Sequence, residues 1–271
     1  MALLRELEVR LGHAYRNLRS VQDATDFLWQ ISENGVRRET YDHGAKHVYY
    51  TAIPEFATER IDPHAADCIH NLRACLDNLV YRLAVLNMAR IGGTVPDDDR
   101  KMAFPICLSK NDWDQKHRQA LNYTSSDAKA FIKGLQPYMR TQPPESDPLW
   151  LLSELDNIDK HRFPLSLSVE RDNTLSFVED VDHSITAEAG ADFGTERMLL
   201  NDAELAIFTV DPPDEAVNVE FDPHFVVVLD EARAAPLERS AENRLRMLYS
   251  AVRSILVEAM HLPEIAHRLG S

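Results

Sequence analysis

The chain has 271 residues and a formal net charge of −15, with 44% hydrophobic and 27% charged residues. This length and composition are typical of a globular protein with a sizeable core. The acidic balance disfavours duplex DNA as a partner, because a negative surface repels phosphate backbones, but it still allows a small cationic pocket. No apolar run approaches the ~20 residues that a membrane span requires, and acidic residues interrupt the N-terminal segment. We therefore expect a cytoplasmic protein with no membrane partner.

The first half of the chain is predicted to be mainly helical. Apolar residues at three- and four-residue steps predict a long helix over residues 3–32. Residues 36–41 and 46–53 are predicted strands, joined as a hairpin at Asp42-His43-Gly44. A second long helix is expected over residues 62–90, because Asp62 and Pro63 suit its start and an apolar stripe runs along it.

Three shorter helices are expected next. Ser109 is a predicted cap of the first, and the second covers residues 124–133. The third begins at Pro148 and runs through about Arg162.

After Pro164 the pattern changes to short, often alternating segments separated by turn residues, which is typical of an antiparallel sheet. The predicted strands are residues 165–169, 175–181, 184–189, 197–200, 204–210, 217–221 and 225–229. A closing helix is expected over residues 237–260.

We infer an α+β fold with a helical bundle core, an N-terminal hairpin and a C-terminal antiparallel sheet. The predicted regions are 1–163 (mainly helical), 164–235 (β) and 236–271 (a helix packing back on the bundle), as one intertwined unit.

The helix over 62–90 carries an ordered row of polar residues. At about 100° per residue, His70, Arg73 and Asp77 fall together beside the apolar stripe, whereas Asn71 and Asn78 fall on a neighbouring flank. A histidine transfers protons near neutral pH, and an arginine binds phosphate or carboxylate groups. We therefore predict a site at which His70, Arg73 and Asp77 are catalytic and the two asparagines bind.

A second polar run lies at the end of the helix that begins at Pro148. Asn157 and His161 share one face at i and i+4, and Arg162 lies nearer the apolar side. If this helix packs against the helix over 62–90, the two polar rows converge on one pocket. His161 is then a fourth catalytic candidate, and Asn157 and Arg162 are binding candidates. Such a pocket suits cleavage of a phosphodiester or capture of an anionic ligand.

The same residues also fit a purely structural role. Arg73 and Asp77 at i and i+4 can form an ordinary helix ion pair, and Asp77 can instead clamp Arg162 between two helices. Sequence spacing does not separate these readings, because ion-pair networks and active sites use the same residue types. Asp67 and His70 at i and i+3 fall short of a metal coordination set, and Cys68, Cys75 and Cys107 form no metal pattern. No metal or other cofactor is expected.

Several segments together resemble a family of uncharacterised bacterial proteins. They are His70-Asn71-Leu72-Arg73-Ala74-Cys75-Leu76-Asp77-Asn78, Phe104-Pro105-Ile106, Leu135-Gln136-Pro137-Tyr138 and Asn157-Ile158-Asp159-Lys160-His161-Arg162. The family carries a His-Asn-Leu-Arg-x-x-Leu-Asp-His segment and a later Asn-x-Asp-Lys-His-Arg segment. The resemblance covers most of the first ~165 residues and brings no established activity with it.

A looser resemblance is to HEPN proteins, many of which are metal-independent ribonucleases that often act as dimers. Their motif has an arginine and a histidine separated by four residues on a bundle helix. Arg73 matches the arginine, but Asn78 stands at the position of the histidine, so an HEPN-type nuclease here needs His70 or His161 for proton transfer. The resemblance implies RNA or a small phosphate-bearing ligand as partner, and a homodimer as the assembly. The alternative is a non-enzymatic interaction protein in which these residues form a buried polar network.

Overall fold

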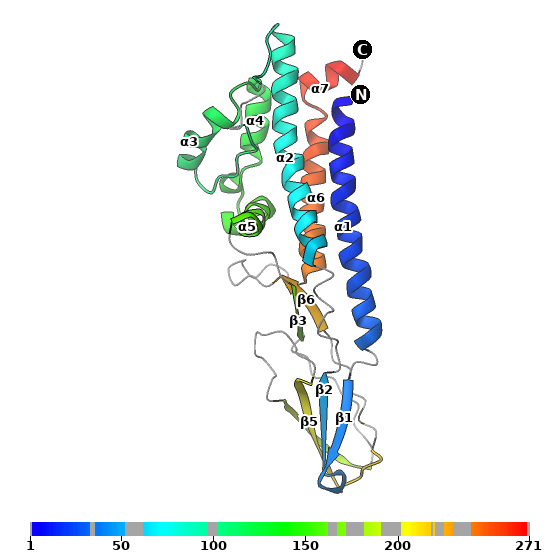
Figure 1. Ribbon diagram of the computed structural model, residues 1–271. Coiled ribbons are helices and arrows are strands. Elements are labelled where there is room, and N and C mark those ends of the chain that lie inside the picture. Colours follow the sequence, from blue (N-terminus) through cyan, green and yellow to red (C-terminus); the bar gives the residue numbers. More distant parts are fainter. Residues whose placement is uncertain are drawn as a thin grey trace.

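The computed structural model describes residues 2–32, 36–51, 62–96, 102–161, 167–171, 182–190, 202–217, 219, 225–229 and 240–269. It is elongated, with helices at one end and a β-sheet at the other, and both chain termini lie at the helical end (Figure 1). The combination of helices with antiparallel sheets confirms the predicted α+β class.

Three long helices form the core of the helical end: α1 (Ala2–Ser32), α2 (Asp62–Arg90) and α6 (Ala241–Ala259). Each of the three contacts the other two, and the short helix α7 (Pro263–Leu269) contacts α2. The predicted bounds of α2 are confirmed, and those of α1 and α6 agree to within a few residues. The predicted apolar stripe of α2 is almost completely buried: Ile69, Leu72, Leu76, Leu79, Val80 and Leu83.

Three further helices complete this end: α3 (Lys110–Ala120), α4 (Ser126–Gly134) and α5 (Pro148–His161). Short 3-10 turns at Pro137–Met139 and Pro144–Ser146 connect α4 to α5. The predicted cap is present, because the Ser109 hydroxyl accepts a hydrogen bond from the backbone N–H of Asp112. Helix α5 is seen nearly end-on in Figure 1, so it runs across the bundle and not along it.

The main sheet is antiparallel, with strand order β1-β2-β5-β4. Its strands are β1 (Val36–Tyr41), β2 (Lys46–Thr51), β4 (Ser184–Ala189) and β5 (Glu204–Asp211). The predicted hairpin is therefore present, with a 3-10 turn at Asp42–Gly44, but it does not stand apart from the later strands. Because β2 pairs with β5, strands more than 150 residues apart in sequence form one sheet.

Two other predicted strands form a separate ladder of β3 (Leu167–Arg171) and β6 (Phe225–Leu229). Of the remaining predicted strands, those over 175–181 and 197–200 lie outside the described residues. In the segment predicted over 217–221, the described residues Val217 and Val219 belong to no strand, and their side chains pack as buried residues under the main sheet.

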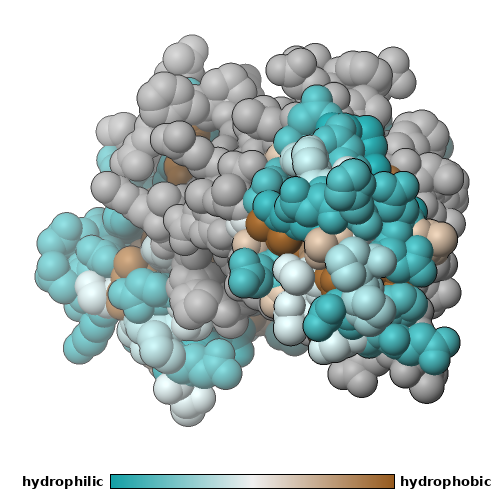
Figure 2. Space-filling model, turned by 90° about the horizontal axis from the view of Figure 1, so that it is seen from below, coloured by the Kyte–Doolittle hydropathy of each residue, from teal (hydrophilic) through white to brown (hydrophobic). Residues whose placement is uncertain are grey.

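Seen from the end opposite that of the helices, the described part of the surface is mainly hydrophilic, with hydrophobic residues only in small groups (Figure 2). Among the described helices, none combines the length and apolar character needed to cross a membrane.

Candidate functional site

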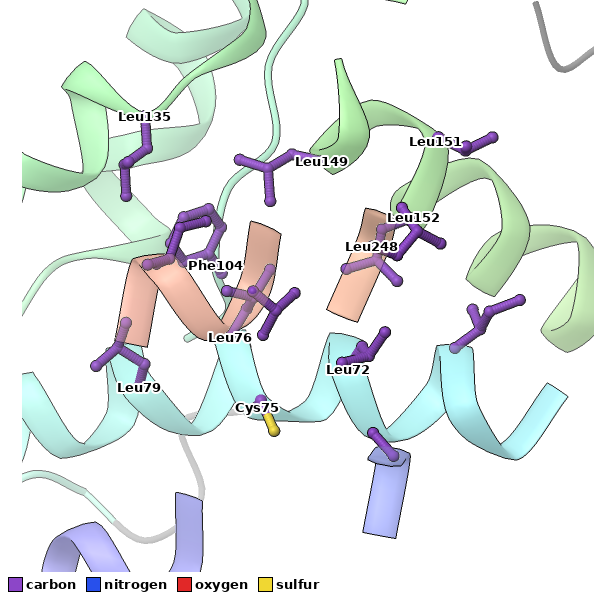
Figure 3. Packing of buried hydrophobic residues seen from close by; sticks show 14 of the residues in the cluster. Leu72, Cys75, Leu76, Leu79, Phe104, Leu135, Leu149, Leu151, Leu152 and Leu248 are labelled. Atoms are coloured by element: carbon purple, nitrogen blue, oxygen red, sulfur yellow. The ribbon is translucent and has the colours of Figure 1, made fainter. Parts of the chain in front are cut away.

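Helices α2 and α5 lie against each other, which is the arrangement that the predicted pocket requires. Leu72 and Leu76 of α2 and Leu152 of α5 are fully buried, and Leu248 of α6 closes the same apolar layer. Figure 3 shows Leu72, Leu152 and Leu248 side by side at this crossing. Because leucines fill the centre of the crossing, the polar side chains of both helices lie along its margins.

His70 lies at this margin and meets a residue that the sequence did not single out. Its Nδ1 is 3.6 Å from Oδ1 of Asp156 on α5, whose side chain is only 6% exposed, while the His70 side chain is 53% exposed. The other oxygen of Asp156 accepts a hydrogen bond of 2.6 Å from Lys160 Nζ. One nearly buried carboxylate is thus shared between an ammonium and an accessible imidazole, which it can orient.

Arg73 and Asp77 both form hydrogen bonds with the backbone of Phe104. Arg73 Nη2 lies 2.9 Å from Asp77 Oδ1 and donates a 2.9 Å hydrogen bond to the carbonyl oxygen of Phe104. The Phe104 N–H in turn donates a 2.8 Å hydrogen bond to Asp77 Oδ1. The Phe104 ring is buried in the core between α2 and Leu149 (Figure 3). This closed arrangement anchors the segment that leads into α3.

The environment of Asp77 is unfavourable for its charge. Burial raises the pKa of this carboxyl above its ordinary value, and the negative charge of Asp156 adds to the effect. Arg73, the Phe104 N–H and Lys160 act in the opposite direction and lower the pKa, but burial is the larger influence. The charges of Asp156 and Lys160 on α5 therefore act on Asp77 of α2.

Beside Arg73 the surface is hollowed by a volume of about 310 Å³. Arg73 and Lys116 are the cations of its lining, and Ser153 of α5 contributes a hydroxyl. Both bonds of Arg73 among the described residues are made by Nη2, which leaves donors on Nη1 and Nε for a ligand. The lining consists of Arg73, Ala103, Phe104, Pro105, Ile106, Lys116, Gln119, Ala120 and Ser153.

The predicted binding residues Asn71 and Asn78 lie elsewhere. They line an open groove of about 1060 Å³ between α2 and the first turns of α1, with Arg5, Arg10 and His13 on its other wall. The amide of Asn71 also donates a 2.7 Å hydrogen bond to the backbone oxygen of Asp67, one turn earlier. The asparagines thus lie on the neighbouring flank of α2 that their spacing predicts, and they do not line the hollow at Arg73.

The remaining predicted residues come from the end of α5. Asn157 is exposed. The side chain of His161 and the whole of Arg162 lie outside the described residues, so the pairing of His161 with Arg73 stays a prediction. Asp156 and Lys160 were missed because an Asp-Lys pair at i and i+4 is an ordinary surface pattern on helices, and nothing in it signals that Asp156 is buried.

The three cysteines are unsuited to thiol chemistry because they are buried. All three cysteines are buried and free, and burial raises the pKa of Cys68 and of Cys75 to about 12. Cys75 points away from Phe104, toward the α1 side of α2 (Figure 3). In the part of the chain that the structure describes, no three histidine, cysteine or acidic side chains come together as metal ligands.

Comparison with protein-family models, curated proteins and solved structures gives no match. The two family resemblances therefore depend on the sequence segments alone.

Proposed function

We propose that this protein binds a phosphate-bearing ligand, RNA or a nucleotide, in the hollow beside Arg73, with His70 as the group that transfers a proton. The observation that carries the proposal is the convergence of Arg73 and Lys116 on one small hollow in a chain of net charge −15. Two cations on an acidic protein create a local site for an anion, and a guanidinium is suited to a phosphate.

The position of His70 supports a catalytic extension of this proposal. His70 lies one helical turn before Arg73, and its partner Asp156 lies one turn after Ser153, which lines the hollow. An exposed imidazole held by a buried carboxylate is a suitable general acid or base for metal-independent cleavage of RNA. The ligand's phosphate would bind to Arg73 and Lys116, and His70 would act on the adjoining hydroxyl or leaving oxygen.

Lys116 provides the clearest test, because it is exposed. Lys116→Ala is expected to weaken binding of nucleoside monophosphates and short RNA by about tenfold, the loss of one charge-assisted contact. Lys110→Ala removes the same charge from the start of the same helix, outside the hollow, and is the matched control. Equal affinities of the two variants would exclude this hollow as the site.

Catalysis is tested separately with His70→Gln. If the wild type cleaves RNA, this variant is expected to lose cleavage by at least about a hundredfold while still binding, since general acid–base catalysis contributes factors of that size. Unchanged cleavage would remove His70 from the mechanism and leave the binding proposal standing.

A second candidate function is favoured by the bonds to Phe104. Arg73 and Asp77 both bond to its backbone, which is the behaviour of a structural network in a non-enzymatic interaction protein. This alternative predicts that the wild type binds no nucleotide or RNA, and that the Lys116 and Lys110 variants are indistinguishable in every assay.

A further inference from the structure

A second hollow, separate from the proposed anion site, lies between the α4–α5 connection and α6. Its volume is about 390 Å³, which is within the range of small-molecule sites. Its lining consists of Leu135, Arg140, Thr141, Gln142, Pro143, Asp147, Pro148, Leu149, Ala251, Ser254, Ile255 and Glu258. None of these residues lines the hollow at Arg73.

The lining divides into an apolar floor and a polar rim. Leu135, Leu149 and Ile255 are buried and make the floor. In Figure 3, Leu135 and Leu149 both point inward, toward Phe104 and α2. An apolar floor with a few polar groups at the edge is the usual composition of a site for a small organic molecule.

The lining of this hollow carries a net negative charge. It contains two carboxylates, Asp147 and Glu258, and a single guanidinium, that of Arg140. Glu258 is exposed on α6, whereas the side chain of Asp147 is only 9% exposed. The combined charge is therefore complementary to a cation.

The two carboxylate oxygens of Asp147 differ in their partners: one accepts a hydrogen bond, and the other makes only a long ion pair. Oδ1 accepts a 2.8 Å hydrogen bond from the backbone N–H of Leu149, as a helix cap does at the start of α5. Oδ2 faces Arg140 Nε at 3.6 Å, which is an ion pair but longer than a hydrogen bond. Burial also raises the pKa of this carboxyl, so a cation bound beside it would relieve an unfavourable environment.

We propose that this hollow binds a small organic cation, an amine with an apolar body, whose ammonium lies between Asp147 and Glu258 and whose body covers Leu135, Leu149 and Ile255. Arg140 is displaced from Asp147 or shares its carboxylate with the ligand. The site requires neither the anion site nor any activity there.

The test uses three probes of matched size: 2-phenylethylamine, 2-phenylethanol and phenylacetate. Binding is measured on the full chain by calorimetry, and by chemical shifts in the NMR spectrum. The amine is expected to bind at least about tenfold more tightly than the alcohol, because it adds a charge-assisted contact to a nearly buried carboxylate. Phenylacetate is expected to bind more weakly than the alcohol.

Variants locate the site. Glu258→Gln and Asp147→Asn are each expected to reduce the preference for the amine over the alcohol while leaving alcohol binding unchanged. Asparagine is also a good helix cap, so Asp147→Asn retains the start of α5. Glu145→Gln removes an exposed carboxylate from the same connection, outside the hollow, and is expected to change nothing.

Three results of the probe comparison would overturn the proposal. They are an amine and an alcohol that bind equally, phenylacetate as the tightest of the three probes, or no binding of any probe at millimolar concentration. A preference for the amine that survives in both carboxylate variants would also overturn it, because the cation would then be bound elsewhere.

Discussion

Asp77 accepts two hydrogen-bonding partners with one oxygen while burial opposes its charge. A carboxyl whose folded pKa lies above its unfolded value makes the folded state bind more protons, so its contribution to stability falls as pH rises through that interval. The interval for Asp77 begins near its ordinary pKa of 3.8 and extends upward.

Asp77→Asn should therefore change how stability depends on pH. The asparagine oxygen can still accept the Phe104 N–H, but it does not titrate. We expect the free energy of unfolding of the wild type, relative to that of the variant, to decrease as pH rises through the interval above 3.8. Urea unfolding at a series of pH values measures this difference. A constant difference would show that the ion pair with Arg73 balances the effect of burial, and an increasing one that it outweighs burial.

The interaction energy between Arg73 and Asp77 can be measured by a double-mutant cycle. Arg73→Ala leaves the half-buried Asp77 carboxylate without its opposite charge and the Phe104 carbonyl oxygen without its donor, and is expected to cost about 1–3 kcal/mol of unfolding free energy. Adding Asp77→Ala should recover part of that loss, because the unpaired charge is removed with it. Strictly additive losses would mean that the two side chains act independently, contrary to the bonds that they share with Phe104.

At the scale of elements, the β1–β2 turn carries a strong conformational requirement. Gly44 has φ of +90°, and a Cβ placed there would lie 2.3 Å from the backbone nitrogen of Glu215. Next to it, buried His47 places Nε2 3.1 Å from the backbone oxygens of both Gly44 and Asp214. The turn and the segment after β5 are thus fitted closely together.

Gly44→Ala is expected to destabilise the protein by clearly more than Gly92→Ala does. Gly92 also has positive φ, +76°, but nothing lies within 4 Å of a Cβ there, so its variant has only the backbone cost of about 1 kcal/mol. Denaturant unfolding of both variants separates the clash from the backbone cost. Equal losses would show that the 214–215 segment moves aside without penalty.

An element can be predicted from the sequence when the residues that determine it are close together in the chain, and not when it depends on a distant partner. Helix α2 is predictable at both ends and along its stripe, because Pro63 and the Ile91-Gly92 turn flank a regular apolar pattern. The pairing of β2 with β5 is not predictable, since strand alternation indicates a face but not a partner. The same limit applies to the site: the row of His70, Arg73 and Asp77 is apparent from spacing, whereas the contribution of Asp156 and Lys116 depends on tertiary packing.

At the scale of the whole molecule, the net charge of −15 determines how a long anion can bind. The hollow beside Arg73 offers two cations within about 310 Å³, whereas the chain as a whole has 44 acidic and 29 basic residues. RNA bound there would gain attraction from one or two phosphates and repulsion along the rest of its length. The proposed site is therefore suited to a short segment or an end, and not to an extended strand.

RNA binding at the hollow should therefore depend only weakly on salt concentration and on RNA length. Two cations on single-stranded RNA correspond to a slope of log K against log salt of about −1.4. We expect that slope for an RNA of about 8 nucleotides and for an RNA of about 20 nucleotides alike, with affinities within about tenfold of each other. Fluorescence anisotropy at several salt concentrations measures both quantities. A much steeper slope for the longer RNA would mean that additional cations outside the hollow contact the strand, and the α1–α2 groove with Arg5, Arg10 and His13 would then be the first place to substitute.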